Sequence, residues 1–144
     1  MKVRAIIVDD EQHCIETLTW QVGKYVPEIE ILQAFNNPAE AMAYLTTHTV
    51  DLVFLDVEMP EMSGFDLLNA LPEIDFEVIF ATAHDEFAIK AFHASAIDYL
   101  LKPVNKDLLI AATKKVLEKK KPAILPEQIE ILKNALGLTK VQKE

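Results

Sequence analysis

The segment from residue 3 to residue 12 reads VRAIIVDDEQ, an apolar run that ends in two aspartates and a glutamate. A nearly continuous apolar run is typical of a strand that is buried on both faces of a parallel sheet. Three adjacent carboxylates repel one another unless a cation lies among them or water solvates them well. The segment therefore predicts a buried strand with a cation site at its carboxyl end, provided that other polar residues converge on the same edge.

Further apolar runs resemble the first, and segments with helical spacing separate them. Pro38 suits the first turn of a helix, and Ser63 and Asn105 stand where helix N-caps are preferred. Five strand–helix units predict a right-handed, doubly wound α/β domain, a five-stranded parallel sheet with helices on both faces. We expect strands at Val3–Val8, Ile29–Phe35, Leu52–Leu55, Val78–Ala81 and Tyr99–Leu101, and helices at Ile15–Val26, Pro38–Leu45, Phe65–Leu71, Glu86–Ala94 and Leu108–Leu117.

Length, composition and charge restrict the class of protein. A chain of 144 residues fits one compact domain, or one domain with a short appendage. Its 51% hydrophobic content and 3 glycines exclude a disordered chain. The net charge of −9 repels nucleic acids and anionic membrane surfaces. We therefore expect no binding of DNA or membranes by this chain alone.

The cysteine content and the two ends of the chain suggest its location and organisation. Cys14 is the one cysteine, the N-terminus has no signal-peptide pattern, and no apolar stretch approaches the ~20 residues of a membrane span. We expect a soluble, cytoplasmic protein. Two prolines after Lys121 indicate a linker at Pro122–Pro126, followed by a short amphipathic helix at Glu127–Leu136. We assign residues 1–121 to the main domain and 122–144 to the linker and short helix.

Polar side chains stand at the ends of four predicted strands. In doubly wound sheets, ligands bind beyond the carboxyl ends of the strands, at the switch in strand order. Carboxylate and backbone carbonyl oxygens suit Mg²⁺, which favours sites that phosphate oxygens complete. The sequence therefore predicts a magnesium site at this edge. The residues expected there are Asp9, Asp10, Asp56, Thr82 and Lys102.

Asp56 is the best candidate for a nucleophile, because it stands alone at the end of a central strand. A carboxylate beside Mg²⁺ can attack a phosphoryl donor while Lys102 and Thr82 neutralise the charge that develops on the transferred oxygens. The chain has no G-x-x-x-x-G-K-[ST] phosphate loop, so a nucleotide is not the expected donor.

Four sequence motifs, in this order and spacing, resemble the receiver domain of two-component response regulators. They are VDDE at 8–11, LDVEMPEMSG at 55–64, ATAH at 81–84 and DYLLKP at 98–103. The likeness covers roughly Lys2 to Lys121, and the run TAHDEFAIKAFHASAIDYLLKPV is most similar to the LytTR-type (LytR/AlgR-like) subgroup. The resemblance implies a flavodoxin-like sheet with strand order 2-1-3-4-5.

The resemblance also implies a role for each residue of the site. Asp56 would be the phosphoacceptor, Asp10 a direct Mg²⁺ ligand, and Asp9 a ligand through water. Glu58 would offer its backbone carbonyl to the metal, and its side chain would tune dephosphorylation together with His84.

A second group of residues would form the switch that responds to phosphorylation. Lys102 would pair with the phosphoryl group, and Thr82 would donate its hydroxyl to a phosphoryl oxygen. Tyr99 would then turn inward behind Thr82 and change the surface formed by the fourth helix, fifth strand and fifth helix. The family further implies a cis peptide bond between Lys102 and Pro103.

The partners implied by this resemblance follow from phosphorelay signalling. A histidine kinase would phosphorylate Asp56, and the switched face, with Phe92, Ala96 and Ile97, would promote a homodimer. Transcription would be regulated through a C-terminal DNA-binding domain outside this chain, of LytTR type. We expect no enzymatic activity beyond self-phosphorylation from a donor and self-dephosphorylation.

Each site residue also has an ordinary structural explanation. Thr82 suits a strand, Tyr99 a core and Lys102 a solvated loop, and the acidic triplet suits the N-terminus of a helix. Together these explanations require independent coincidences at four strand ends, so we favour the phosphoacceptor.

Two other functions and a transition-metal site are less favoured. A haloacid-dehalogenase-type phosphatase would have a second aspartate two residues after the nucleophile, where this chain has Glu58, and would need room for a cap domain. A pseudo-receiver that only binds partners would lack some of the acceptor residues. The four histidines show no zinc-like spacing with Cys14.

Overall fold

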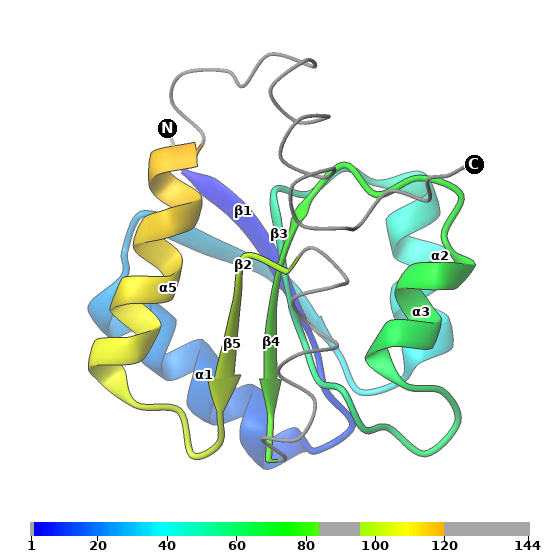
Figure 1. The fold of residues 1–144 in the computed structure, drawn as a ribbon, viewed down its shortest axis with the longest axis horizontal. Helices are drawn as coiled ribbons and strands as arrows, with labels where there is room; N and C mark the ends of the chain where they lie inside the picture. Colours follow the sequence, from blue (N-terminus) through cyan, green and yellow to red (C-terminus); the bar gives the residue numbers. More distant parts are fainter. Residues whose placement is uncertain (1, 84–95, 120–144) are drawn as a thin grey trace, which may run out of the picture.

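The structure is a computed structural model that describes residues 2–83 and 96–119. Its centre is a five-stranded parallel sheet with the strand order β2-β1-β3-β4-β5 (Figure 1). Both the predicted fold class and the implied strand order are therefore confirmed. The strands are β1 (Val3–Val8), β2 (Ile29–Phe35), β3 (Leu52–Leu55), β4 (Glu77–Thr82) and β5 (Asp98–Leu101).

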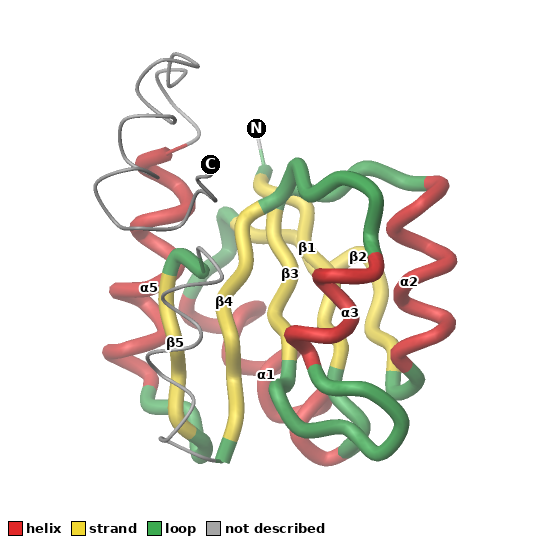
Figure 2. The backbone as a smooth tube through the Cα atoms, turned by 45° about the vertical axis from the view of Figure 1, so that its right-hand side comes forward, coloured by secondary structure: helices red, strands yellow, loops and turns green. Residues whose placement is uncertain are grey.

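The described helices cover both faces of the sheet. Helices α1 and α5 pack on one face, and α2 and α3 pack on the other, so the domain has three layers (Figure 2). Compared with the predicted bounds, α2 and α5 are longer, whereas α1 and α3 begin earlier and end one residue earlier. The helices are α1 (Gln12–Tyr25), α2 (Pro38–Thr47), α3 (Gly64–Ala70) and α5 (Lys106–Lys119). The helix predicted at 86–94, the linker and the helix predicted at 127–136 lie outside the described residues.

The predicted helix starts are confirmed by their capping contacts. Ser63 and Asp66 form a reciprocal capping box at α3, in which each side chain accepts a hydrogen bond from the backbone of the other. Asn105 accepts a hydrogen bond from the backbone N–H of Leu108 at 3.0 Å, and Pro38 occupies the first turn of α2. Local sequence thus determines where these helices begin.

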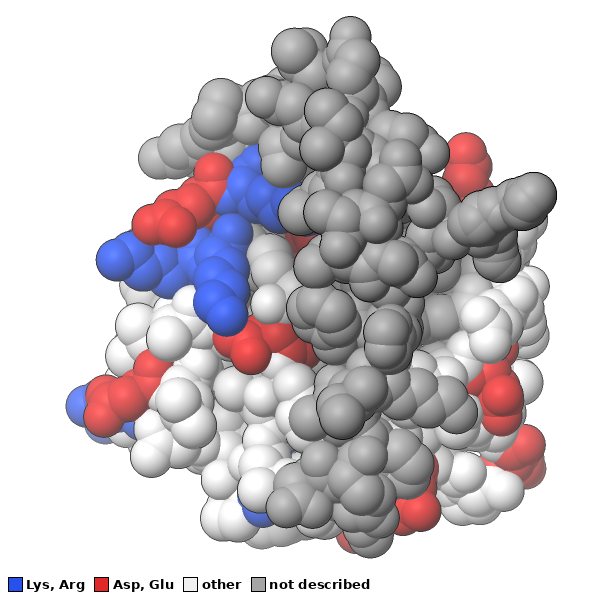
Figure 3. Space-filling view, viewed as in Figure 1, with Lys and Arg blue, Asp and Glu red and all other residues white. Residues whose placement is uncertain are grey.

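Helix α5 is tied to the sheet by ion pairs as well as by its apolar face. Lys115 lies 2.9 Å from Asp98 on β5, and Lys119 lies 3.3 Å from Glu77 on β4. Figure 3 shows basic side chains gathered over α5, with acidic side chains among them. These exposed pairs contribute little stability individually, about 0–1 kcal/mol each, so apolar packing holds the helix in place.

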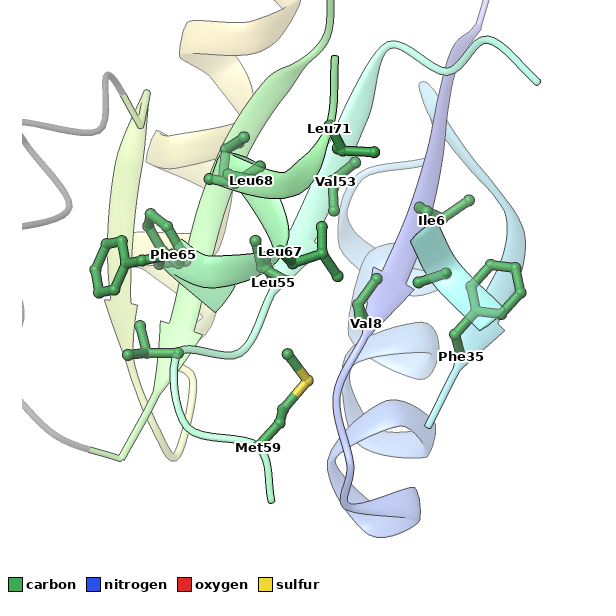
Figure 4. Packing of buried hydrophobic residues seen from close by; sticks show 14 of the residues in the cluster. Ile6, Val8, Phe35, Val53, Leu55, Met59, Phe65, Leu67, Leu68 and Leu71 are labelled. Carbon is green, nitrogen blue, oxygen red and sulfur yellow. The ribbon is translucent and has the colours of Figure 1, made fainter. Parts of the chain in front are cut away.

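Alternating strand residues supply the two apolar cores. On β1, Ile6 and Val8 face α2 and α3, whereas Ala5 and Ile7 face α1 and α5. Figure 4 shows how the apolar side chains of α3, among them Leu67, pack against the sheet. No helix in residues 2–83 and 96–119 has the length and apolar character needed to cross a membrane.

The strand register carries the polar residues to one edge of the sheet. Val8 on β1 is paired with Leu55 on β3, so the residues that follow them, Asp9 and Asp56, emerge side by side. The backbone N–H of Asp56 donates to the carbonyl of Val8 at 2.9 Å. On the other side, the N–H of Lys102 donates to the carbonyl oxygen of the last β4 residue at 2.7 Å. The ends of β1, β3, β4 and β5 therefore converge.

Candidate functional site

Three carboxylates meet at the carboxyl edge of the sheet. Asp9, Asp10 and Asp56 each offer an oxygen that lies within 4.8 Å of the other two. Asp9 and Asp56 are each 5% exposed, although a buried carboxylate normally needs a paired charge or hydrogen bonds. These three carboxylates could together hold a cation.

Lys102 provides the positive charge nearest to these carboxylates. Its Nζ lies 2.8 Å from Asp9, 3.7 Å from Asp56 and 3.6 Å from Glu11. Burial lowers the pKa of Lys102, but the hydrogen bond with Asp9 and the charges of Asp56 and Asp9 outweigh burial and raise that pKa. The ammonium group is therefore firmly charged at any physiological pH.

The carboxyl group of Asp56 is harder to ionise than an ordinary aspartate, despite the nearby Lys102. Burial, the negative charge of Asp9, and the hydrogen bond and charge of Asp10 raise the pKa of Asp56 to about 7, while Lys102 partly opposes them. One ammonium thus does not compensate the carboxylates fully. A divalent cation would relieve the remaining repulsion, and a set of hard oxygen donors fits Mg²⁺.

A pocket of about 230 Å³ opens beside the carboxylates. A cavity of roughly 10–15 Å³ is enough to hold one water molecule, so this pocket has room for a small oxyanion and several waters. Acidic, hydroxyl and ammonium groups on its wall can bind such a pair. The pocket is lined by Asp10, Glu11, Asp56, Glu58, Thr82, Ala83 and Lys102.

Asp9 is held more tightly than its neighbour Asp10. One oxygen of Asp9 accepts the backbone N–H of Glu11 at 2.9 Å, and the other accepts Nζ of Lys102 at 2.8 Å. Glu11 occupies the N-cap position of α1, but its side chain accepts no capping hydrogen bond from that helix. Helix capping therefore does not explain the presence of Glu11 in the acidic triplet.

The structure brings five of the predicted site residues together and places others nearby. The five are the three aspartates, Thr82, which is fully buried, and Lys102. Glu58 is exposed at the rim of the pocket. Tyr99 is half-buried and packs against the core cluster under α2 and α3. Pro103 follows Lys102 through a cis peptide bond. His84 and Phe92 lie outside the described residues.

Three residues near the site were not predicted from the sequence. Glu11 lies 3.6 Å from Nζ of Lys102 and accepts a hydrogen bond from the Cys14 thiol at 3.1 Å. Burial, and secondly this hydrogen bond, raise the pKa of Cys14 to about 11. Gly64 approaches so closely that an added Cβ would lie 2.5 Å from the carbonyl oxygen of Asp56. A glycine directly after the cap residue Ser63 was the available signal for that approach.

Comparison with known proteins agrees with this geometry. The sequence profile of the response regulator receiver domain matches residues 5–114. The sensory transduction protein LytR of Staphylococcus saprophyticus is 38% identical over 116 residues, 79% of this chain and 48% of that protein. The transcriptional regulatory protein BtsR of Escherichia coli K12 is 36% identical over 135 residues, 91% of this chain and 56% of that protein. The chain spans about half the length of these curated relatives.

Solved structures show the same architecture. The response regulatory domain of MrkE from Klebsiella pneumoniae superposes with a TM-score of 0.73 at 29% identity, covering 80% of this chain and 95% of that one. The response regulator TrrA of Thermotoga maritima, solved with Mg²⁺ and beryllofluoride, gives a TM-score of 0.69 at 31% identity and covers 81% of this chain and 99% of that one. The chain therefore belongs to the receiver domain family of two-component response regulators.

Proposed function

We propose that Asp56 is the residue that accepts a phosphoryl group from a histidine kinase. One observation carries the assignment: Asp56 is a buried carboxylate that faces the pocket, beside two further aspartates and 3.7 Å from the ammonium group of Lys102. Asp9 is also buried, but both of its oxygens already accept hydrogen bonds. Asp56 is thus the better placed nucleophile.

The reaction transfers the phosphoryl group from nitrogen to oxygen. A carboxylate oxygen of Asp56 forms a bond to phosphorus, and the bond between phosphorus and the imidazole nitrogen of the donor histidine breaks. The electron pair of that bond stays on the imidazole, which takes up a proton from solvent. Lys102 and Thr82 line the pocket. The ammonium group of Lys102 and the hydroxyl of Thr82 would neutralise charge on the transferred oxygens.

The donor set supports a role for Mg²⁺ in this step. We assign Asp10 and Asp56 as direct ligands, together with the backbone carbonyl of Glu58. Asp9 would act through a water molecule, since Lys102 and the N–H of Glu11 engage its two oxygens. When bound, the metal neutralises charge on the phosphoryl oxygens and orients them toward the nucleophile.

The same site would control a switch at the β5 side of the sheet. We assign Thr82, Tyr99 and Lys102 to this switch, because β4 and β5 pair directly and Tyr99 packs against the core beside them. Pro103 follows Lys102 beyond the end of β5 and would belong to the same switch. Glu58 and His84 would tune the lifetime of the phosphoryl group.

The change at this switch would promote a homodimer through the face that includes β5 and α5. Two exposed apolar side chains support this face: Leu101 on β5 is 44% exposed, and Leu108 on α5 is 58% exposed. Ala96 and Ile97 are partly buried in the domain, so they contribute less than the sequence suggested.

The output of the whole protein would be transcriptional. The relatives that support this assignment carry the names sensory transduction protein and transcriptional regulatory protein, and this chain spans about half of each. We assign residues 1–121 to a cytoplasmic receiver and 122–144 to a linker toward a DNA-binding domain of LytTR type. The net charge of −9 argues against DNA contacts by the receiver itself.

Phosphorylation by a small donor tests the assignment of Asp56. Incubation with acetyl phosphate and Mg²⁺ should add one phosphoryl group to the intact mass. The variant Asp56→Asn should lose this addition, whereas Asp75→Asn, at an exposed aspartate, should retain it. A phosphoryl group that persists in Asp56→Asn would overturn the assignment.

A further inference from the structure

Gln21 links helix α1 to the loop that follows Lys102. Its Nε2 donates a hydrogen bond to the carbonyl oxygen of Val104 at 3.0 Å, across a separation of 83 residues. A carbonyl oxygen only accepts hydrogen bonds, so the amide nitrogen of Gln21 must face Val104. Helix α1 therefore holds the loop between β5 and α5 through a side chain outside the pocket.

The loop needs such a tether in its middle. At one end, the N–H of Lys102 donates to the carbonyl of Thr82, and at the other, Asn105 caps α5. Pro103, between these ends, has no N–H to donate. Val104 thus carries the contact that fixes the centre of the loop to the body of the domain, and it packs partly buried against the core cluster under α1 and α5.

Burying the amide oxygen of Gln21 costs free energy, which indicates that the hydrogen bond from its Nε2 to Val104 is useful. Its Oε1 is buried and accepts no hydrogen bond from residues 2–83 or 96–119. Leaving a buried acceptor without a hydrogen bond destabilises the fold, and an apolar side chain of the same length would avoid that cost. The polar contribution that glutamine makes in return is the hydrogen bond to Val104.

We propose that Gln21 is a positioning residue for Lys102. By fixing Val104, it fixes the loop behind Lys102, so that the ammonium group stays within reach of the phosphoryl group on Asp56. This inference rests on the proposed function, in which Lys102 pairs with that group. Gln21 lines no part of the pocket and acts through the loop.

The variant Gln21→Met tests the proposal because methionine keeps the length and removes the donor. With Mg²⁺ present, its affinity for beryllofluoride, a phosphoryl mimic, should fall roughly three- to tenfold, as expected from the loss of one ordering hydrogen bond. The Mg²⁺ affinity should stay within about twofold, because the proposed metal ligands lie on other loops. Isothermal titration calorimetry measures both affinities. Gln33→Met, at an exposed glutamine of β2, is the matched control and should change neither.

A double-mutant cycle separates action through Lys102 from a general structural effect. Lys102→Ala should itself weaken beryllofluoride binding, and Gln21→Met should cause no further loss in that background. Equal losses in both backgrounds, or no loss in Gln21→Met alone, would overturn the role of Gln21 while leaving the proposed function intact. If Lys102→Ala binds beryllofluoride as tightly as the parent, the assignment of Lys102 itself fails. Thermal unfolding before each titration confirms that every variant is folded.

Discussion

At the scale of single residues, the site is defined by an imbalance of charge. Asp9, Asp10 and Asp56 converge, and Lys102 supplies one nearby ammonium. The sequence predicted these four residues, because each stands one or two positions after a recognisable strand. It did not predict that Glu11 would also contact Lys102, since that contact depends on side-chain placement across two loops.

The raised pKa of Asp56 makes stability depend on pH when no metal is present. The folded chain binds this proton more tightly than the unfolded chain, so the contribution to stability is complete below the ordinary pKa of 3.8 and is lost as pH rises through about 7. In EDTA, Asp56→Asn should therefore stabilise the domain at pH 8 by about 1–3 kcal/mol, and by much less at pH 4. Thermal unfolding across this range measures the difference. An Asp56→Asn curve parallel to that of the parent at every pH would contradict the assigned environment.

Removal of Asp10 should abolish most binding of Mg²⁺. Asp10 is partly exposed and forms a carboxylate cluster with Asp9 and Asp56. Asp10→Ala would remove one of the proposed Mg²⁺ ligands. The parent should gain thermal stability with rising Mg²⁺ concentration, and Asp10→Ala should gain little. Equal Mg²⁺ affinities in the two proteins would show that the metal binds elsewhere. Asp75→Asn serves as the charge control.

At the level of secondary-structure elements, the start of α3 lies against the edge of the sheet that carries Asp56. Gly64 donates its N–H to the carbonyl of Val57 at 2.8 Å and lies directly against the backbone of Asp56. The sequence predicted the strand bounds of β1, β2 and β3 correctly, because each is a short apolar run between polar residues. The predicted β4 and β5 were too short, because their first residues, Glu77 and Asp98, are polar and pair with lysines of α5. The predicted β4 also left out Thr82, the last residue of that strand.

Two glycine substitutions should have opposite effects on stability. Gly64→Ala should destabilise the domain by about 1–3 kcal/mol, because its Cβ would meet the carbonyl oxygen of Asp56 at 2.5 Å and backbone must move. It should also weaken Mg²⁺ binding.

Gly23→Ala should stabilise the domain by about 0.5–1 kcal/mol, since Gly23 lies within α1 and its Cβ would meet nothing within 4 Å. Urea unfolding measures both, and a stable Gly64→Ala would contradict the close approach.

In the molecule as a whole, parallel pairing of the strands brings the ends of β1, β3, β4 and β5 together in one site. Alternating βα units predicted the sheet and its ligand-binding edge, and the family resemblance supplied the strand order. Contacts between distant segments, such as Gln21 with Val104, leave no trace in local periodicity and needed the folded structure. The same holds for the extent to which Ala96 and Ile97 are buried.

Phosphorylation should increase self-association of this chain. The exposed apolar residues Leu101 and Leu108 lie on the proposed dimer face, so Leu108→Glu should weaken the dimer without changing phosphorylation. Sizing with multi-angle light scattering, with and without acetyl phosphate, measures the change. A phosphorylated chain that remains monomeric at all concentrations would contradict the proposed dimer.

In the proposed function, Asp56 accepts the phosphoryl group in a reaction that needs Mg²⁺. Borohydride converts an aspartyl phosphate to homoserine, so reduction after incubation with acetyl phosphate marks the acceptor permanently for peptide sequencing by mass spectrometry. We expect homoserine at position 56, in the presence of Mg²⁺ and not in EDTA. Homoserine at Asp9 or Asp10 instead, or equal labelling of Asp56 in EDTA, would contradict the proposed function.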